Sequence, residues 1–191
     1  MTKEEYICEI GKRMYARQLV SDCDGNISVR NQNEIIITPT MVNKGFMDAS
    51  QMVYTDLNGN VLKGGKPSSE IKLHLAIYKK RPDINAVVHA HPVCACTFAI
   101  NGRAVDQRYM PEAIMSLGII PVAPYAKPST EQVAQSVEPF THKHNGVLLA
   151  NHGAVTWGKT LTDAYNLMEQ LEFYCKTVIL AEMTGTPQII P

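Results

Sequence analysis

Apolar residues recur at helical spacing near both ends of the chain. After Thr2 and Glu5, a pair typical of a helix-capping box, the pattern predicts a helix over residues 3–20. Its apolar positions are Ile7, Ile10, Met14 and Leu19. A longer pattern of the same kind predicts a final helix over residues 161–183.

Between these helices, short alternating or continuous apolar runs are separated by turn residues, a pattern typical of strands. Strands are predicted at 26–30, 34–38, 52–56, 86–91, 119–122, 146–150 and 154–157. Further helices are predicted at 92–100, 112–117 and 130–137, with another that Ser68 and Ser69 cap and that ends near residue 80. The early strands come as hairpins, so we expect an α/β protein with three layers in an α+β arrangement, a central and mainly antiparallel sheet flanked by helices. No repeat or linker divides residues 1–191, which we interpret as a single domain.

Composition and charge narrow the function classes. The 191 residues are 45% hydrophobic, and 18 basic residues balance 18 acidic ones, which argues against disorder and against a nucleic-acid partner. No apolar run approaches the roughly 18 residues of a membrane span, so no membrane partner is expected. The five cysteines form no Cys-x-x-Cys pair, a usage typical of reduced thiols in a cytoplasmic protein.

Three histidines are the sharpest candidates for chemistry. His89 and His91 lie two residues apart in a predicted strand, so both side chains project from the same face. His152 lies in the turn after another apolar strand. Taken singly, each is also compatible with a polar residue at a strand edge or in a turn. Together they would form a catalytic metal site with one coordination position open for water or substrate.

Glu70 and three polar loops complete the candidate site. Glu70 either favours the dipole of the helix that it precedes, or serves as a metal ligand or general base. Ser68 and Ser69 either cap that helix or present an anion site at its N-terminus. With Gly25-Asn26 and the turn that ends at Thr40, they could enclose a phosphate without an arginine cluster, in keeping with the zero net charge.

Six segments in register resemble the class II aldolase/adducin family, and within it the L-fuculose-1-phosphate aldolase type. The matching segments are Gly25-Asn-Ile-Ser-Val-Arg30, Ile37-Thr-Pro-Thr40, Lys66-Pro-Ser-Ser-Glu70, Val87-Val-His-Ala-His91, Pro121-Val-Ala-Pro-Tyr125 and Asn151-His-Gly153. The resemblance implies a Zn²⁺-dependent aldolase, or one using another divalent cation, that reversibly cleaves L-fuculose 1-phosphate or a related deoxyketose 1-phosphate. The products would be dihydroxyacetone phosphate and a small aldehyde.

The resemblance also implies residue roles. His89, His91 and His152 would bind the metal, and Glu70 would complete the shell without substrate and then act as acid and base. Substrate phosphate would be held by Gly25, Asn26, Thr40, Ser68 and Ser69. The family's usual assembly implies a homotetramer with active sites between subunits.

This sequence departs from the aldolase pattern at two places. Met41 stands where a glycine usually follows Thr40, so one backbone contact to phosphate is expected to differ. The aldolases carry a tyrosine from the neighbouring subunit near Met110, and Tyr109 or Glu112 is the candidate for a secondary acid here.

Three alternatives stay open at this stage. Two belong to the same superfamily: a pentulose-5-phosphate 4-epimerase and a methylthioribulose-1-phosphate dehydratase. The third is a non-catalytic, adducin-like interaction module. The full set of three histidines and Glu70 argues against it, because a scaffold requires none of them.

Overall fold

The computed structural model describes residues 1–191 and is built around one eight-stranded sheet. The strands lie in the order β4-β3-β2-β1-β5-β8-β7-β6, and every neighbouring pair is antiparallel except β6 and β7. Their bounds are β1 Asn26–Asn31, β2 Glu34–Ile37, β3 Val53–Asp56, β4 Val61–Lys63, β5 Ala86–Ala90, β6 Val122–Ala123, β7 Gly146–Leu149 and β8 Gly153–Gly158. The predicted fold class is confirmed.

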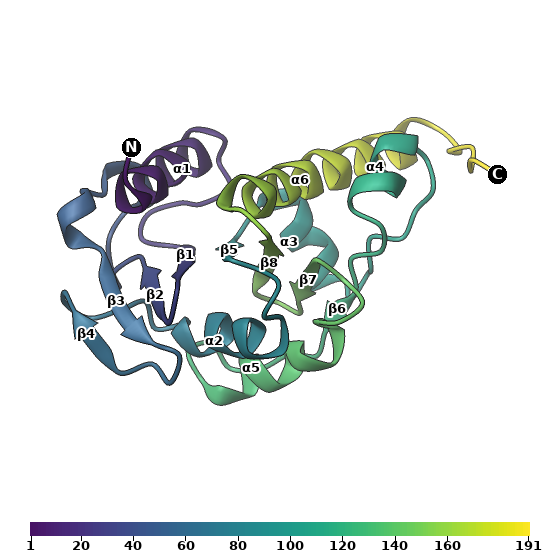
Figure 1. The fold of residues 1–191 in the computed structure, drawn as a ribbon. Helices are drawn as coiled ribbons and strands as arrows, with labels where there is room; N and C mark the ends of the chain where they lie inside the picture. Colours follow the sequence, from purple (N-terminus) through teal and green to yellow (C-terminus); the bar gives the residue numbers. More distant parts are fainter.

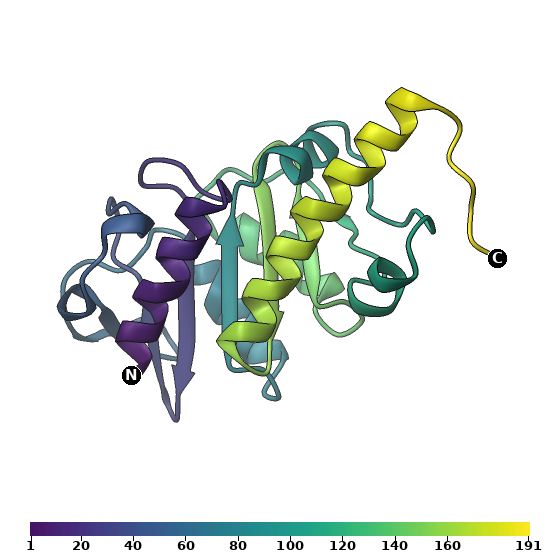
Figure 2. The same ribbon diagram turned by 90° about the horizontal axis from the view of Figure 1, so that it is seen from above.

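Helices cover both faces of this sheet (Figures 1 and 2). Their bounds are α1 Lys3–Ala16, α2 Ile71–Lys80, α3 Val93–Ile100, α4 Pro111–Ser116, α5 Glu131–Val137 and α6 Leu161–Thr184, with single 3-10 turns η1 Lys44–Phe46, η2 Ala49–Gln51 and η3 Glu138–Phe140. In Figure 1, α1 and α6 lie on one side of the sheet, and α2 and α5 lie on the other. None of the helices combines the length and the apolar character that a membrane crossing requires.

Two hydrophobic cores follow from this layering. Val88 belongs to the cluster that contains the buried faces of α1 and α6, whereas its neighbour Val87 belongs to the cluster that contains α2 and α5. This is the two-residue alternation of a strand covered on both faces. His89 shares the face of Val87, so its side chain projects toward the layer in which α2 begins.

The first helix is shorter than predicted. The helix α1 ends at Ala16 because Gln18 adopts a left-handed φ of 58°, which no helix accommodates. The amide of Leu19 then donates to the carbonyl of Met14, and the Leu19 side chain is buried although it lies outside the helix. The hydrophobic spacing therefore extends beyond the end of the helix, and the spacing alone does not indicate where the helix ends.

Two further bounds are corrected. The helix α2 begins at Ile71, and Ser68 does not cap it; its hydroxyl instead accepts a hydrogen bond from the Glu70 amide at 3.3 Å. The strand predicted at 119–122 is only the two-residue β6, since Ile120 pairs with Val105 in an isolated bridge before β6 begins. The short edge strand β4 was not predicted.

Candidate metal centre and adjoining cavity

The three histidines come together because two strands pair. His89 lies in β5, His91 directly follows that strand, and His152 lies in the turn between β7 and β8. The strands β5 and β8 are antiparallel, so the end of β5 lies beside the beginning of β8, with Ala90 opposite Ala154. Residues that are more than 60 positions apart in the sequence therefore meet at one edge of the sheet.

The imidazole rings form a compact triangle. Their centroids are separated by 5.0 Å for His89 and His91, 4.9 Å for His89 and His152, and 5.0 Å for His91 and His152. One nitrogen from each ring lies within 4.8 Å of the others. The Nε2 atoms of His89 and His91 are 3.2 Å apart, and two nitrogens on a tetrahedral Zn²⁺ are about 3.3 Å apart for Zn–N distances near 2.0–2.1 Å. The donor set fits a metal ion.

Burial keeps these three imidazole rings in the neutral form that can coordinate a metal ion. It lowers the pKa of all three histidines, that of His152 to about 4, so the rings are neutral and carry lone pairs. The Nδ1 of His89 donates to the carbonyl of Ala154 at 2.9 Å, which leaves Nε2 free to coordinate. The Nδ1 of His152 is buried and has no hydrogen-bond partner, as expected of a nitrogen in a ligand site.

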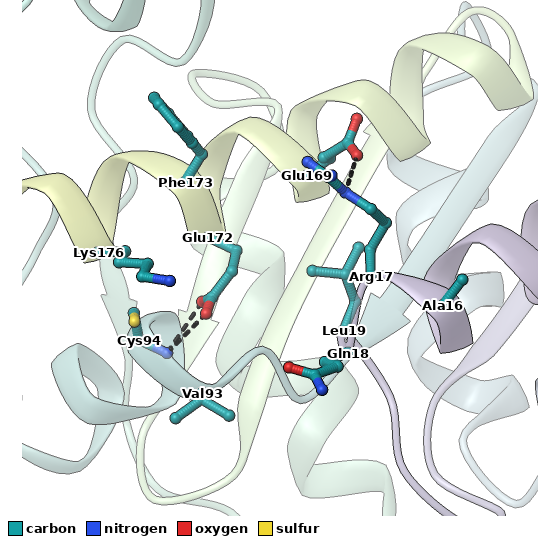
Figure 3. Close-up of a pocket in the computed structure, with 10 residues that line it drawn as sticks. All are labelled: Ala16, Arg17, Gln18, Leu19, Val93, Cys94, Glu169, Glu172, Phe173 and Lys176. Carbon is teal, nitrogen blue, oxygen red and sulfur yellow. Dashed lines mark hydrogen bonds and ion pairs between the residues drawn. The ribbon is translucent and has the colours of Figure 1, made fainter.

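Two carboxylates support His91 and the segment behind it. Asp24 Oδ2 lies 3.6 Å from His91 Nδ1, on the side of the ring away from His89. Glu172 of α6 accepts hydrogen bonds from the amide of Cys94, drawn in Figure 3, and from the amide of Ala95; both residues lie in the first turn of the helix α3, just after His91. A carboxylate at a helix N-terminus pairs with otherwise unsatisfied amides. The chain that leaves His91 is thereby anchored to the longest helix.

A cavity of about 200 Å³ opens beside the histidines. Every residue that the sequence analysis assigned to the metal or the phosphate lines it, together with several that it did not assign. The lining residues are Cys23, Asp24, Gly25, Asn26, Pro39, Thr40, Met41, Lys44, Ser68, Ser69, Glu70, His89, His91, Pro128, Ser129 and His152. Met41 has a left-handed φ of 57°, a conformation that a glycine, the residue which the resemblance led us to expect here, would adopt without strain.

Glu70 is buried in this cavity but does not belong to the group of three histidines that could hold a metal ion. It is 7% exposed, and its Oε1 accepts from the amide and the hydroxyl of Ser129, at 2.5 and 3.3 Å. Burial raises the pKa of Glu70, and the bonds from Ser129 oppose that shift only in part. Its other oxygen, Oε2, makes no hydrogen bond within the chain and is therefore free for a proton or a ligand.

A buried hydrogen-bond chain fixes the side chain of Asn26. His74 of α2 is fully buried; its Nε2 is 2.6 Å from Asn26 Oδ1 and its Nδ1 is 2.6 Å from Ser28 Oγ. Ser28 Oγ is also 2.9 Å from the Tyr78 hydroxyl. Because an amide oxygen only accepts, His74 donates from Nε2, and the amide nitrogen of Asn26 is left to face the cavity.

Sequence reasoning assigned no role to several residues that line the cavity, among them Asp24, Lys44 and Ser129, and two of its candidates, Tyr109 and Glu112, lie outside the cavity of their own subunit. Asp24 directly precedes Gly25, and Ser129 and Lys44 lie near other turns, so only their proximity to assigned loops could have indicated them. Tyr109 and Glu112, the candidates for a secondary acid, do not line the cavity of their own subunit. Tyr109 instead lies against α6, where its amide donates to the Tyr174 hydroxyl.

Comparison with known proteins agrees with this geometry. Residues 5–179 match the family model described as the Class II Aldolase and Adducin N-terminal domain. This match, the sheet between helices and the histidine triangle at the strand ends define an enzyme of the lyase class. The chain belongs to the class II aldolase and adducin family.

Individual relatives carry two different activities. An L-fuculose phosphate aldolase of Methanococcus maripaludis strain S2 is 38% identical over 175 residues, which cover 90% of this chain and 93% of the relative. A 3-oxo-tetronate 4-phosphate decarboxylase of Haemophilus influenzae is 32% identical over 177 residues, 90% of this chain and 84% of the relative. Among solved structures, an L-fuculose 1-phosphate aldolase superposes with a TM-score of 0.92 at 30% identity, covering 100% of this chain and 92% of that one.

Proposed function

We propose that this protein is a Zn²⁺-dependent aldolase that reversibly cleaves a ketose 1-phosphate, L-fuculose 1-phosphate or a related deoxyketose 1-phosphate, to dihydroxyacetone phosphate and a small aldehyde. The observation that carries the proposal is the sharing of one cavity by three neutral imidazoles, a buried carboxylate and loops rich in amide and hydroxyl donors. The relatives named for fuculose phosphate cleavage support the choice of substrate class.

In this proposal His89, His91 and His152 hold the metal, and Glu70 completes the shell when no substrate is bound. A divalent cation in that position would supply Lewis-acid stabilisation of the negative charge that develops on the substrate oxygens. Neutral ligands leave the full charge of the cation available, and the lowered pKa values keep the three rings neutral at physiological pH. Asp24 orients His91 from behind.

Glu70 moves the proton. When the bond between C3 and C4 of the ketose breaks, the C4 hydroxyl gives up its proton as C4 becomes the aldehyde carbonyl. The electron pair of the bond stays on the dihydroxyacetone phosphate half, and C3 must then be protonated. A carboxyl with a raised pKa holds a proton at higher pH than an ordinary glutamate and can return it to carbon. Glu70 Oε2 is the atom assigned to this transfer, because Ser129 already occupies Oε1.

Gly25, Asn26, Thr40, Ser68 and Ser69 bind the substrate phosphate. They belong to three loops around one cavity, and backbone amides and hydroxyls can hold a phosphate without a cluster of basic side chains. The phosphate lies at the end of the substrate that does not react, so its binding free energy positions the carbon that does.

The decarboxylase relative adds a reaction that the sequence analysis did not consider, and the two reactions share an intermediate. Loss of CO₂ from a 3-oxo-tetronate 4-phosphate leaves the electron pair on the same carbon of dihydroxyacetone phosphate as the aldol cleavage does. The same cavity therefore suits either reaction, and only the leaving group differs. Decarboxylation is the second candidate, on the strength of the 32% identical relative.

One experiment tests the half-reaction common to both candidates. Dihydroxyacetone phosphate is incubated with the zinc-loaded protein in D₂O, and exchange of its hydroxymethyl proton is followed by NMR. Exchange is expected with the wild type, and it should be slower by a factor of about 100 in Glu70→Gln, which keeps the metal. The exposed Glu131 provides the control variant Glu131→Gln. Exchange that is unaltered in Glu70→Gln would remove this residue from the mechanism.

A second step separates the candidates. The protein is supplied with dihydroxyacetone phosphate and a panel of small aldehydes, and separately with 3-oxo-tetronate 4-phosphate. Formation of a ketose 1-phosphate supports the aldolase, whereas CO₂ release without it supports the decarboxylase. Absence of proton exchange and of both products would contradict the proposal and favour a non-catalytic module.

The active form is proposed to be a homotetramer with its sites between subunits. Large apolar side chains such as Val93 and Phe173 are exposed, and both line a shallow surface hollow of about 560 Å³ between the end of α1, the start of α3 and α6 (Figure 3). In the assembly, Tyr109 or Glu112 would serve as the secondary acid in a neighbouring cavity. Light scattering tests the subunit number. A monomer with full activity would contradict the assembly.

A cytoplasmic location is also proposed. All five cysteines are free in the structure, including the buried Cys8 and Cys175. Thiols in this number persist in reducing compartments. Fractionation of the source cells tests the location.

A further inference from the structure

Lys44 is the only cation among the residues that line the cavity, and it is almost completely buried. Its side chain is 1% exposed, and no carboxylate forms an ion pair with it. The cause is local packing. The helix α1 lies so close to the turn η1 that a Cβ added to Gly11 would be 2.5 Å from the Lys44 carbonyl oxygen. Lysine is rarely buried without a charged partner, so this position calls for one.

The hydrogen bonds of the ammonium leave one donor unused. Nζ donates to the carbonyl of Cys23 at 3.0 Å and to the carbonyl of Val42. An ammonium has three N–H donors, so one remains for a ligand in the cavity. Cys23 and Val42 belong to the loops that carry Gly25-Asn26 and Thr40, so Lys44 lies between two of the three loops assigned to the phosphate.

The charges of the cavity point in the same direction. Its lining includes the carboxylates of Asp24 and Glu70, which repel an anionic substrate, and Lys44 is the only lysine or arginine side chain there that attracts one, in addition to the proposed metal ion. Burial lowers the pKa of Lys44, because the ammonium has lost hydration that a bound anion would replace. Hydrogen bonds to charged groups are the strong ones in proteins, particularly where water is excluded.

We propose that the Lys44 ammonium is a substrate-binding charge that selects a phosphate dianion over an uncharged hydroxyl at the non-reacting end of the substrate. This inference rests on the proposed function, since it concerns the phosphorylated half of that substrate. The proposal also adds a charged group to the phosphate site. The sequence indicated a cradle of neutral donors, whereas the structure adds a single buried positive charge between two of its loops.

The competing explanation is that Lys44 only ties the two loops together through the Cys23 and Val42 carbonyls. The two explanations differ in their dependence on the phosphate. A loop clamp affects every substrate of the cavity alike, whereas a binding charge affects only those that carry the anion. Dihydroxyacetone phosphate and dihydroxyacetone form a matched pair for this distinction, since they differ only in the phosphate.

The test is proton exchange with both compounds in wild type, Lys44→Gln and Lys66→Gln. Lys66 is exposed and does not line the cavity, and its variant makes the same change in net charge. For Lys44→Gln, kcat/KM with dihydroxyacetone phosphate should fall about 10- to 100-fold, mainly through KM. The value with dihydroxyacetone should change less than about threefold, as should both values for Lys66→Gln.

Two results would overturn the proposal. Equal losses with both compounds would show that Lys44 acts as a loop clamp, and unchanged kinetics with dihydroxyacetone phosphate would show that its charge is not used. In either case, proton exchange by the wild type would still support the proposed function. If the wild type exchanges neither compound, the proposed function fails and the role of Lys44 fails with it.

A measurement on the wild type keeps the proposal testable if Lys44→Gln does not fold. Lysine is labelled with ¹³C at Cε, and the Lys44 resonance is assigned by its loss in Lys44→Arg. Inorganic phosphate added to the zinc-loaded protein should shift the Lys44 resonance in a saturable manner and leave that of Lys66 unmoved. A Lys44 resonance that stays in place through saturation of the catalytic cavity would refute direct contact.

Discussion

His74 makes the fold sensitive to acid, and the size of the effect follows from its burial. The ring is fully buried and holds Asn26 and Ser28 by two short hydrogen bonds. Burial lowers the pKa of His74 from 6.5 to about 3. The unfolded chain therefore binds a proton, between these two pKa values, that the folded chain does not. The stability due to neutral His74 is present in full above pH 6.5 and is lost as the pH falls toward about 3.

The expected magnitude can be worked out from these two pKa values. Between about pH 7 and about pH 5 this one residue should lower the free energy of unfolding by about 2 kcal/mol, approaching about 5 kcal/mol near pH 3. The perturbation is His74→Gln, which keeps an amide donor and acceptor but does not titrate. It should be less stable than wild type at neutral pH and should lack this part of the acid sensitivity.

The assay is urea unfolding of the metal-free proteins at several pH values, with His142→Gln as control because His142 is exposed. Contributions from carboxylates and from the other histidines are common to all the proteins and cancel in the difference. The difference in the free energy of unfolding between wild type and His74→Gln should become smaller by about 2 kcal/mol from about pH 7 to about pH 5. The free energy of unfolding of His142→Gln should change with pH as that of wild type does. A difference between wild type and His74→Gln that stays constant would refute the reasoning.

Three further variants test the metal centre. His91→Ala should lose bound zinc while keeping its circular-dichroism spectrum, and unchanged zinc content would refute the ligand assignment. Gly153→Ala should also lose metal affinity, because the added Cβ would lie 2.6 Å from His91 Cδ2 and 2.5 Å from the Ala90 carbonyl oxygen; a wild-type dissociation constant for zinc would show that the ring does not need this space. Asp24→Asn should weaken zinc binding by about 10- to 100-fold, measured by competition with a chelator, if its carboxylate orients His91.

The elements that the sequence predicted well are those with a clear hydrophobic period. The strands β1 and β5 and the helix α6 lie within about two residues of their predicted bounds. The errors arose where packing and periodicity disagree. Leu19 continues the apolar spacing of α1 and is buried, but a left-handed residue next to it ends the helix. Such a break depends on one φ angle and leaves no periodic trace.

The residues of the site likewise fall into those that a local sequence pattern could predict and those that it could not. His89 and His91 could be predicted because a strand places alternate residues on one face. Lys44 and His74 could not, since a lysine usually indicates solvent and a helical histidine usually indicates nothing in particular. Their roles depend on contacts across the fold, such as that between Lys44 and the Cys23 carbonyl, which no local pattern contains.

The pairing of β1 with β5 places Asn26 directly opposite His89. The group proposed to bind the phosphate and the group proposed to bind the metal thus face each other on neighbouring strands, and the distance between them is fixed by interstrand hydrogen bonds. The backbone therefore sets the distance that the three-carbon half of the proposed substrate would span. The half of the proposed substrate that leaves, an aldehyde or a carboxylate, lies outside this distance, so a change of leaving group does not require the pairing of β1 with β5 to change.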